Sequence, residues 1–178
     1  FRTLGEGRSE EDHETFKDAN GPGLTVIHVA KISVTMLGQF GVTVDTVPVD
    51  ESHWARRHAA ALVKVLALAP NLRLHREQVL DLLWPDDTVE EAAPKLHKAA
   101  HFARRAIDVP NAVVLRGDTV ALGPETDTVV DVVEFEALAR RALADADVTA
   151  ARAALAAYGG ELLPGDYVVS ADLTDLGS

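Results

Sequence analysis

Apolar and polar residues alternate in two runs near the start of the sequence. Every second position is apolar over residues 32–36, and the same period of two returns over 40–44. The intervening Gly38-Gln39 predicts a β-hairpin closed by a two-residue type II′ turn. A short edge strand is expected at Val47-Pro48-Val49, because proline cannot donate a hydrogen bond within a central strand.

The spacing of apolar residues then changes to the three-and-four period of helices, and three helices are predicted. The first begins with Ser52 as its N-cap and ends before Pro70, and the second spans residues 76–84. The third covers about 92–107. It accommodates Pro94 only if this residue stands in the first turn, where its missing N–H has no partner.

The third helix is basic on one side. Residues 92–107 hold four lysines and arginines and no carboxylate. At 100° per residue, one continuous apolar arc contains Leu96, Ala99, Ala100, Ala103, Ala106 and Ile107. The opposite arc contains His97, Lys98, His101, Arg104 and Arg105, with Lys95 and Phe102 at its flank. A helix that docks by one face and presents a basic face to solvent suits a polyanion, and an ordinary solvated helix is the alternative.

A second hairpin and a pair of alanine-rich helices follow. Residues 113–116 and 119–122 flank Gly117-Asp118, which predicts the hairpin. In the helical pair, Asp131 with Glu134 resembles a capping box, and Asp147 is expected to cap the second helix. The residues expected on the packed sides are Val132, Phe135, Leu138, Leu143, Ala151, Ala154, Leu155 and Tyr158.

Such a pair resembles one TPR-like unit of a helical repeat, which cannot bury its apolar faces alone. We therefore expect an exposed apolar face, covered by a second copy of the chain or by the preceding domain.

Composition limits the class of protein. The 178 residues include no cysteine, which excludes disulfides, thiolate catalysis and cysteine zinc sites. No apolar run reaches the ~18 residues that span a bilayer, so the sequence predicts a cytoplasmic protein without a membrane partner. Residues 1–23 are acidic and poor in large apolar side chains, and a disordered tail is expected there.

The net charge of −11 hides an uneven distribution. Residues 53–117 contain ten lysines and arginines against seven carboxylates, a net charge of +3, whereas the rest of the chain carries −14. A ligand responds to the local field more than to the total charge, so a basic middle between acidic flanks remains compatible with DNA.

The order of the predicted elements is hairpin, helix, helix, basic helix, hairpin, and this is the order of a winged helix-turn-helix. The fold class expected is an α+β winged helix-turn-helix followed by a short α-helical, TPR-like segment. In this arrangement the third helix enters the major groove and the second hairpin, the wing, reaches the DNA backbone. The sequence therefore predicts a DNA-binding transcriptional regulator whose partner is double-stranded promoter DNA.

Several segments also resemble a known family. Arg73–Asp86 resembles the second helix, Leu96–Ile107 the recognition helix and Val114–Asp118 the wing of OmpR/PhoB-type winged helices. Val132–Leu138 and Tyr158–Pro164 resemble the opening of a bacterial transcriptional activator domain. Proteins that join these two domains include the Streptomyces antibiotic regulatory proteins. The resemblance covers most of the chain, and the linked motifs make it specific.

This resemblance implies a winged-helix domain over residues 24–124 and the start of an activator domain over 129–178. Activator domains of the family continue through several more helices, so we expect either a fragment or a regulator without the larger effector part. The resemblance implies a sequence-specific transcriptional regulator of the activator type. The mechanism we expect is docking of the winged helix on promoter DNA as a pair of copies on direct repeats, with a homodimer as a possible partner arrangement.

The resemblance also implies roles for individual residues. The third helix and wing would contact DNA through Lys95, His97, Lys98, His101, Arg105 and Arg116. The loop before the third helix would contact RNA polymerase through Asp86, Asp87, Glu90 and Glu91, and a solvated connecting loop is the alternative. By their position at the start of the first helix, Arg56 and Arg57 are candidates for phosphate contacts, and a solvated face is the more frequent outcome for such residues. Arg104 either joins the DNA-binding set or pairs with a carboxylate of the core.

Other kinds of site were weighed against DNA binding. His97 and His101 have the i, i+4 spacing of zinc ligands, but Lys98 stands where a metalloprotease has glutamate and would repel a metal. No metal or cofactor is therefore predicted. The aromatic residues Trp54, Trp84 and Phe102 are interpreted as anchors of the core or its rim.

Two functions from other classes remain as alternatives. An enzyme would need a clustered nucleophile and base or paired inward carboxylates, and no such constellation is found, so no catalytic residue is predicted. The second alternative is a winged-helix protein–protein interaction module that no longer reads DNA, which the acidic flanks and the short helical repeat favour.

Overall fold

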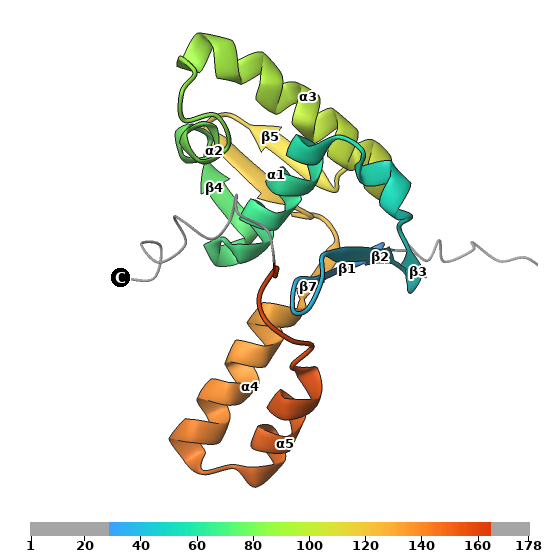
Figure 1. Ribbon diagram of the computed structural model, residues 1–178, viewed down its shortest axis with the longest axis vertical. Helices are drawn as coiled ribbons and strands as arrows, with labels where there is room; N and C mark the ends of the chain where they lie inside the picture. The colour runs from blue at the N-terminus through green and yellow to red at the C-terminus, as the bar shows by residue number, and fades with distance from the viewer. Residues whose placement is uncertain (1–28, 165–178) are drawn as a thin grey trace, which may run out of the picture.

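The computed structural model describes residues 29–164, which contain five α-helices and two β-sheets. Three helices and both sheets form one body (residues 29–130), and the last two helices project from it as a pair (Figure 1). The order of hairpin, three helices, hairpin and helical pair is the predicted one. The expected acidic tail at residues 1–23 lies outside the described residues.

The first sheet has the strand order β3-β2-β1-β7. Its antiparallel hairpin joins β1 (Lys31–Thr35) to β2 (Gly41–Val44), and the predicted edge strand is β3 (Val47–Pro48). The prediction of a two-residue type II′ turn is wrong, because five residues, 36–40, connect the two strands. The sequence analysis also missed β7 (Asp127–Val130), which follows the second hairpin and pairs in parallel with β1.

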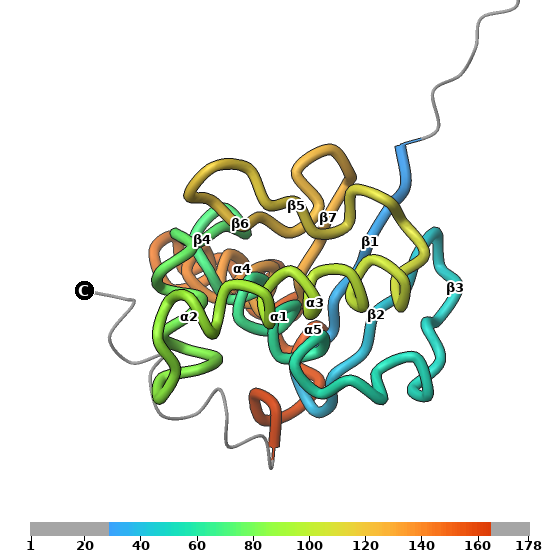
Figure 2. The backbone as a smooth tube through the Cα atoms, turned by 90° about the horizontal axis from the view of Figure 1, so that it is seen from above, coloured from blue at the N-terminus to red at the C-terminus, as the bar shows by residue number. Residues whose placement is uncertain are grey.

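The three helices of the body are α1 (Arg57–Leu68), α2 (Arg76–Leu83) and α3 (Val89–Ile107). The second sheet has the order β4-β6-β5 and contains β4 (Arg73–His75), β5 (Val113–Arg116) and β6 (Thr119–Leu122). Two short 3-10 helices, η1 (Glu51–Trp54) and η2 (Pro70–Leu72), flank α1. Seen from above, α3 overlies α1, and α4 and α5 lie beneath the body (Figure 2).

Two predicted helix starts are wrong. Ser52 does not cap α1; Asp50 caps η1 by accepting from the Ser52 N–H, and α1 begins only at Arg57. Pro94 is not in the first turn of α3, because a capping box between Thr88 and Glu91 starts that helix at Val89. Pro94 is therefore the sixth helical residue, and the carbonyl four residues before it accepts no helical hydrogen bond from it.

The predicted apolar arc of α3 is confirmed, and it forms much of the core. All six of its residues are at most 5% exposed, and most are alanine. The buried face of α1 is also rich in alanine and includes Leu62 and Leu66, each fully buried. Small side chains on both helices let their backbones approach closely, so α3 is held against α1 along one defined face.

The helical pair consists of α4 (Asp131–Asp145) and α5 (Val148–Ala157). Asp147 caps α5 as predicted, accepting from the N–H groups of Thr149 and Ala150 at 2.9 and 3.0 Å. The predicted inward positions of Leu143 and Leu155 are wrong, since these side chains are 87% and 75% exposed. The expected exposed apolar face is thus present on the pair.

Asp131 does not form the predicted capping box with Glu134. It is the first residue of α4, and its carboxylate accepts hydrogen bonds from the N–H groups of Met36 and Leu37, at 2.9 Å each. These donors lie in the loop between β1 and β2, about 95 residues away in sequence. The carboxylate therefore fastens the start of the helical pair to the first sheet.

The chain after α5 returns to the same loop. The N–H of Gly38 donates to the Glu161 carbonyl at 2.8 Å, and the N–H of Leu163 donates to the Met36 carbonyl at 2.9 Å. A Cβ atom on Gly38 would lie 2.6 Å from the Gly159 carbonyl oxygen, and φ of Gly38 is +88°, so only glycine fits this crossing. The helical pair is thus attached to the body at both of its ends.

We predict that Asp131→Asn lowers the free energy of unfolding by about 1–3 kcal/mol, because it removes the charge from a partly buried set of carboxylate hydrogen bonds. Chemical denaturation measures the loss, and hydrogen exchange should show faster exchange of the Met36 and Leu37 amides. Asp145→Asn at the exposed end of α4 is the control. A variant as stable as the wild type, with unchanged exchange at both amides, would contradict the role given to Asp131.

Candidate nucleic-acid interface

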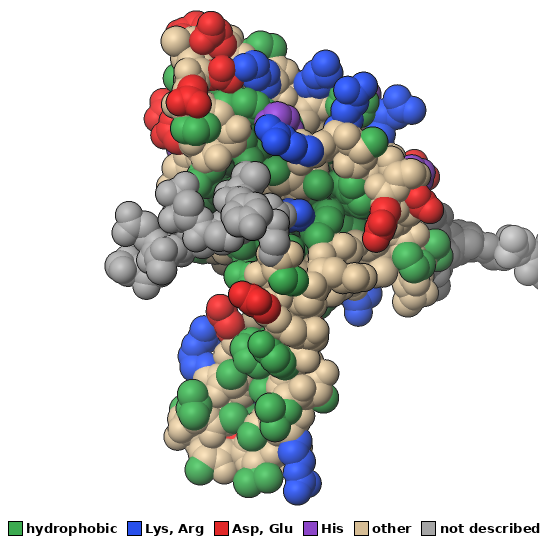
Figure 3. Space-filling model, viewed as in Figure 1, with side chains coloured by type: hydrophobic (Ala, Val, Ile, Leu, Met, Phe, Trp, Pro, Cys, Tyr) green, Lys and Arg blue, Asp and Glu red, His purple; other side chains and the backbone are tan. Residues whose placement is uncertain are grey.

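The exposed face of α3 carries positive charge and no carboxylate after Glu91. His97, Lys98, His101 and Arg105 are all exposed, while the opposite face of the helix is buried. In the space-filling view, Lys and Arg side chains follow the upper edge of the molecule over α3 (Figure 3). The capping box at Thr88 fixes where this helix starts, and burial against α1 fixes which face is turned to solvent.

Arg104 does not belong to this exposed face. Its Nη1 donates a hydrogen bond of 2.8 Å to the carbonyl of Val113, and the side chain is partly buried. The partner is thus a backbone carbonyl of β5 and not the core carboxylate considered from the sequence. Arg104 joins the end of α3 to the second hairpin and sets the angle between them.

Lys95 is exposed but already has an anionic partner. Its Nζ forms an ion pair with Asp87, whose side chain is 23% exposed, against 47% for that of Lys95. The pair bridges the α2–α3 loop and the first half of α3. A phosphate that bound Lys95 would have to compete with this carboxylate.

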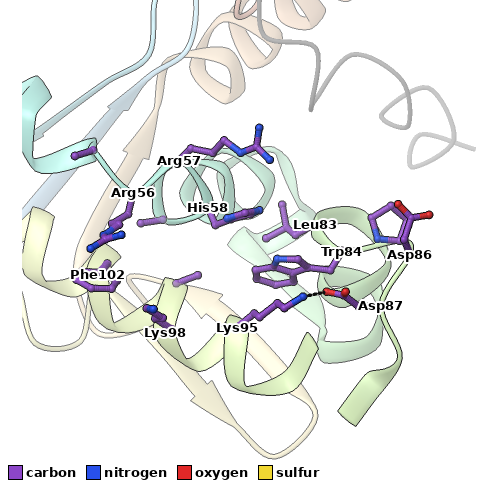
Figure 4. Close-up of a pocket in the computed structure, with 14 residues that line it drawn as sticks. Arg56, Arg57, His58, Leu83, Trp84, Asp86, Asp87, Lys95, Lys98 and Phe102 are labelled. Atoms are coloured by element: carbon purple, nitrogen blue, oxygen red, sulfur yellow. Dashed lines mark hydrogen bonds and ion pairs between the residues drawn. The ribbon is translucent and has the colours of Figure 1, made fainter. Parts of the chain in front are cut away.

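Arg56 and Arg57 lie at the start of α1, beside α3. The Arg56 guanidinium lies over the ring of Phe102, 5.2 Å from its centroid, and this contact connects the start of α1 to α3. Both arginines line a groove of about 720 Å³ together with Lys95 and Lys98. Figure 4 shows this groove and the side chains that line it.

His58 lies in the same groove and stacks on Trp84, with ring centroids 5.2 Å apart and an angle of 29° between the planes. Partial burial lowers the pKa of His58, and the positive charges of Arg57 and Lys95 lower it further, while Asp87 acts in the opposite direction. The sequence analysis assigned Trp84 to the core, which its 8% exposure supports, but it did not identify His58. Only the position of His58 at the start of an amphipathic helix could have drawn attention to it.

Arg116 lies at the turn between β5 and β6, where Gly117 has a φ of +57°. Its side chain is 83% exposed and lies 3.8 Å from Glu125, a distance and exposure that make the ion pair weak. The Arg76 N–H donates to the Asp118 carbonyl at 2.7 Å, so the turn is held against the start of α2.

The acidic loop before α3 contains two kinds of carboxylate. Glu91 accepts hydrogen bonds in the capping box and Asp87 pairs with Lys95, so both support the start of α3. Asp86 and Glu90 are exposed and have no ion pair or side-chain hydrogen bond within residues 29–164. These two carboxylates are the ones available to a partner.

In the described part of the chain, no three His, Cys, Asp or Glu side chains are placed to hold a metal ion. Among the helices of residues 29–164, none is both long and apolar enough to cross a membrane.

Comparison with known proteins identifies a fold. No protein-family model matches the chain, and no curated protein is significantly similar to it. Among solved structures, the chain is similar to EmbR of Mycobacterium tuberculosis, determined in complex with a low-affinity phosphopeptide, with a TM-score of 0.55 and 20% sequence identity. The match covers 75% of this chain and 38% of the EmbR chain, so this chain spans well under half of EmbR.

We predict that His58 makes the protein less stable in acid. Because its pKa is lowered in the folded state, the unfolded chain binds the proton more readily, and stability is lost as the pH falls below the ordinary value of 6.5. Urea unfolding at about pH 7.5 and 5.5 should show a smaller loss of stability for His58→Gln than for the wild type. His97→Gln, which replaces an exposed histidine of α3, is the control. An equal loss in His58→Gln and the wild type would disprove this account.

Proposed function

We propose that this protein is a transcriptional regulator that binds double-stranded promoter DNA through a winged helix-turn-helix. In this proposal α2 and α3 are the helix-turn-helix, α3 enters the major groove, and the β5–β6 hairpin is the wing. The observation that carries it is the exposed face of α3, which holds His97, Lys98, His101 and Arg105 and no carboxylate between Pro94 and Ile107.

The exposed cations of α3 would have two tasks. Lysine and arginine pair best with the O6 and N7 atoms of guanine, and each bidentate contact contributes about 1–3 kcal/mol of discrimination. Phosphate contacts are more frequent and fix the register of the protein on the duplex. Lys98 and Arg105, which have no ion-pair partner within residues 29–164, are the side chains we assign to DNA.

The second hairpin would contact the backbone or the minor groove beside α3. Arg116 at its turn is highly exposed and only weakly paired, so it can exchange Glu125 for a phosphate at little cost. Arg104 is excluded from direct contact in this proposal. Its hydrogen bond to Val113 instead positions the hairpin relative to the recognition helix.

The helical pair would be the start of a TPR-like activator domain, as the family resemblance implies. Asp86 and Glu90, in the loop before α3, would face a basic surface of RNA polymerase. Pairing of two copies on adjacent DNA sites would bring their exposed apolar faces together. The sequence resemblance and the fold shared with EmbR support this part of the proposal.

An interaction module that has lost DNA binding is the second candidate function. The exposed Leu143 and Leu155 of the helical pair favour it, because apolar side chains of this size are usually covered by a partner. The two candidates differ in which surface is needed. DNA binding depends on α3, whereas protein binding through the pair would not respond to changes there.

We predict that Lys98→Glu/Arg105→Glu abolishes DNA binding. Fluorescence anisotropy of a labelled duplex pool of about 30 base pairs, at several salt concentrations, should give wild-type binding that weakens as salt is added, with a slope of about −0.9 for each phosphate neutralised. Each substitution reverses a charge at the DNA surface, so repulsion replaces attraction.

The control is Arg140→Glu/Arg152→Glu, which makes the same change of charge on the helical pair. This variant should keep most of the affinity. No binding of the wild type at low salt, or an equal loss in both double variants, would be incompatible with DNA recognition by α3.

A further inference from the structure

The groove between α1 and α3 lies next to the outward face of α3 and shares Lys98 with it. It lies between the start of α1, the loop after α2 and the first two-thirds of α3. Its volume of about 720 Å³ falls in the range of pockets that hold small molecules, about 300–1,000 Å³. The groove therefore has room for more than a single water or ion.

Charges in the groove are divided between two ends. At one end, Arg56 lies over Phe102 and Lys98 projects from α3 beside them (Figure 4). At the other end, Lys95 is paired with Asp87, which leaves its charge largely neutralised. Arg57 points away from Phe102 and Lys98. The end with Phe102 thus has two cations, and no carboxylate lines it.

The chemistry of that end suits a tetrahedral anion. A guanidinium offers two parallel N–H donors that match two oxygens of a phosphate, and a lysine adds a mobile point charge. Contact with Phe102 limits the freedom of Arg56, so less entropy is lost when it binds. At the other end, the stacked rings of His58 and Trp84 line the groove.

We propose that the groove between α1 and α3 binds phosphoryl groups, with Arg56 and Lys98 as the groups that hold the anion. Two sources can supply this chemistry. One is a phosphate of the DNA strand that borders the major groove, and this source rests on the proposed function. The other is a small phosphorylated molecule whose remaining part lies along His58 and Trp84, and this source does not depend on DNA binding.

The site is tested first with pyrophosphate as the probe. Trp54→Phe leaves Trp84 as the only tryptophan of the chain, so its emission reports on the groove. Pyrophosphate should change this emission in a saturable way, against sodium chloride of matched ionic strength. In the same background, Arg56→Gln should weaken the apparent affinity about tenfold, as expected for loss of one charged hydrogen-bond donor.

Arg105→Gln is the matched control, because it removes an exposed cation of α3 that does not line the groove. It should leave pyrophosphate binding within about twofold of the wild type. A second measurement follows His58 by NMR. A bound anion offsets the charges of Arg57 and Lys95, which act on His58 together with Asp87, so the pKa of His58 should rise as pyrophosphate is added to the wild type. In Arg56→Gln the same rise should need about tenfold more pyrophosphate.

The effect of Arg56→Gln on DNA binding separates the two sources, because Lys98 is shared with the DNA-binding face and Arg56 is not. If the groove holds a DNA phosphate, Arg56→Gln reduces the slope of log K against log salt by about one. If the groove serves a small molecule, Arg56→Gln weakens pyrophosphate binding and leaves that slope unchanged. Either result supports the site.

The proposal is overturned if Trp84 shows no saturable response, or if Arg56→Gln and Arg105→Gln weaken the response equally. The proposed function fails independently, when the wild type binds no DNA. Pyrophosphate binding without DNA binding would therefore support the phosphoryl site in the groove and contradict the proposed DNA-binding function. DNA binding without a pyrophosphate response would support the proposed function and contradict the phosphoryl site.

Discussion

Close packing of alanine-rich faces on α1 and α3 is the constraint on which the candidate interface depends. Because these faces have small side chains, the two helices meet along a defined line, and α3 has only one rotation about its axis that buries its apolar arc. That rotation turns His97, Lys98, His101 and Arg105 outward together. The same packing places the start of α1 beside α3, and so creates the groove.

A second set of contacts connects the helical pair to this body. The loop between β1 and β2 receives the Asp131 carboxylate from one side and residues 161–163 from the other. Since β7 leads directly into α4 and pairs with β1, the pair is held by backbone as well as side-chain hydrogen bonds. The helical pair is therefore fastened to the first sheet at both of its ends.

The parts of the fold that could be predicted are those in which apolar residues repeat with a regular spacing over a short stretch of sequence. The arc of α3 around Leu96 follows from a period of 3.6, and the hairpin at Gly117-Asp118 follows from alternation on both sides of a turn. Asp131 shows the limit of such reasoning. Its spacing to Glu134 matches a capping box. The Asp131 carboxylate instead accepts hydrogen bonds from the N–H groups of Met36 and Leu37, which are distant in sequence.

The candidate site could likewise be predicted only where it depends on the regular spacing of residues along α3. Periodicity identified Lys98 and Arg105 as exposed, but it also placed the partly buried Arg104 on the same face, and it could not show which cations have partners in the fold. Lys95 is paired because the α2–α3 loop brings Asp87 back to the helix, and Arg104 is bound because β5 brings the Val113 carbonyl beside it. The groove could not be predicted at all, since it depends on the packing of α1 against α3.

The positions of the charged side chains along α3 distinguish those that stabilise the helix from Lys98, which has no such role. Glu90 and Glu91 in the first turn and Arg104 and Arg105 in the last are where the helix dipole favours them, so all four contribute to helix stability whatever else they contact. Lys98 has no such explanation. Its neighbours at i−4 and i+4 are Pro94 and Phe102, where a helix built for stability alone would carry a carboxylate. A mid-helix cation without an intrahelical partner gains its favourable interaction only when an anion arrives from outside.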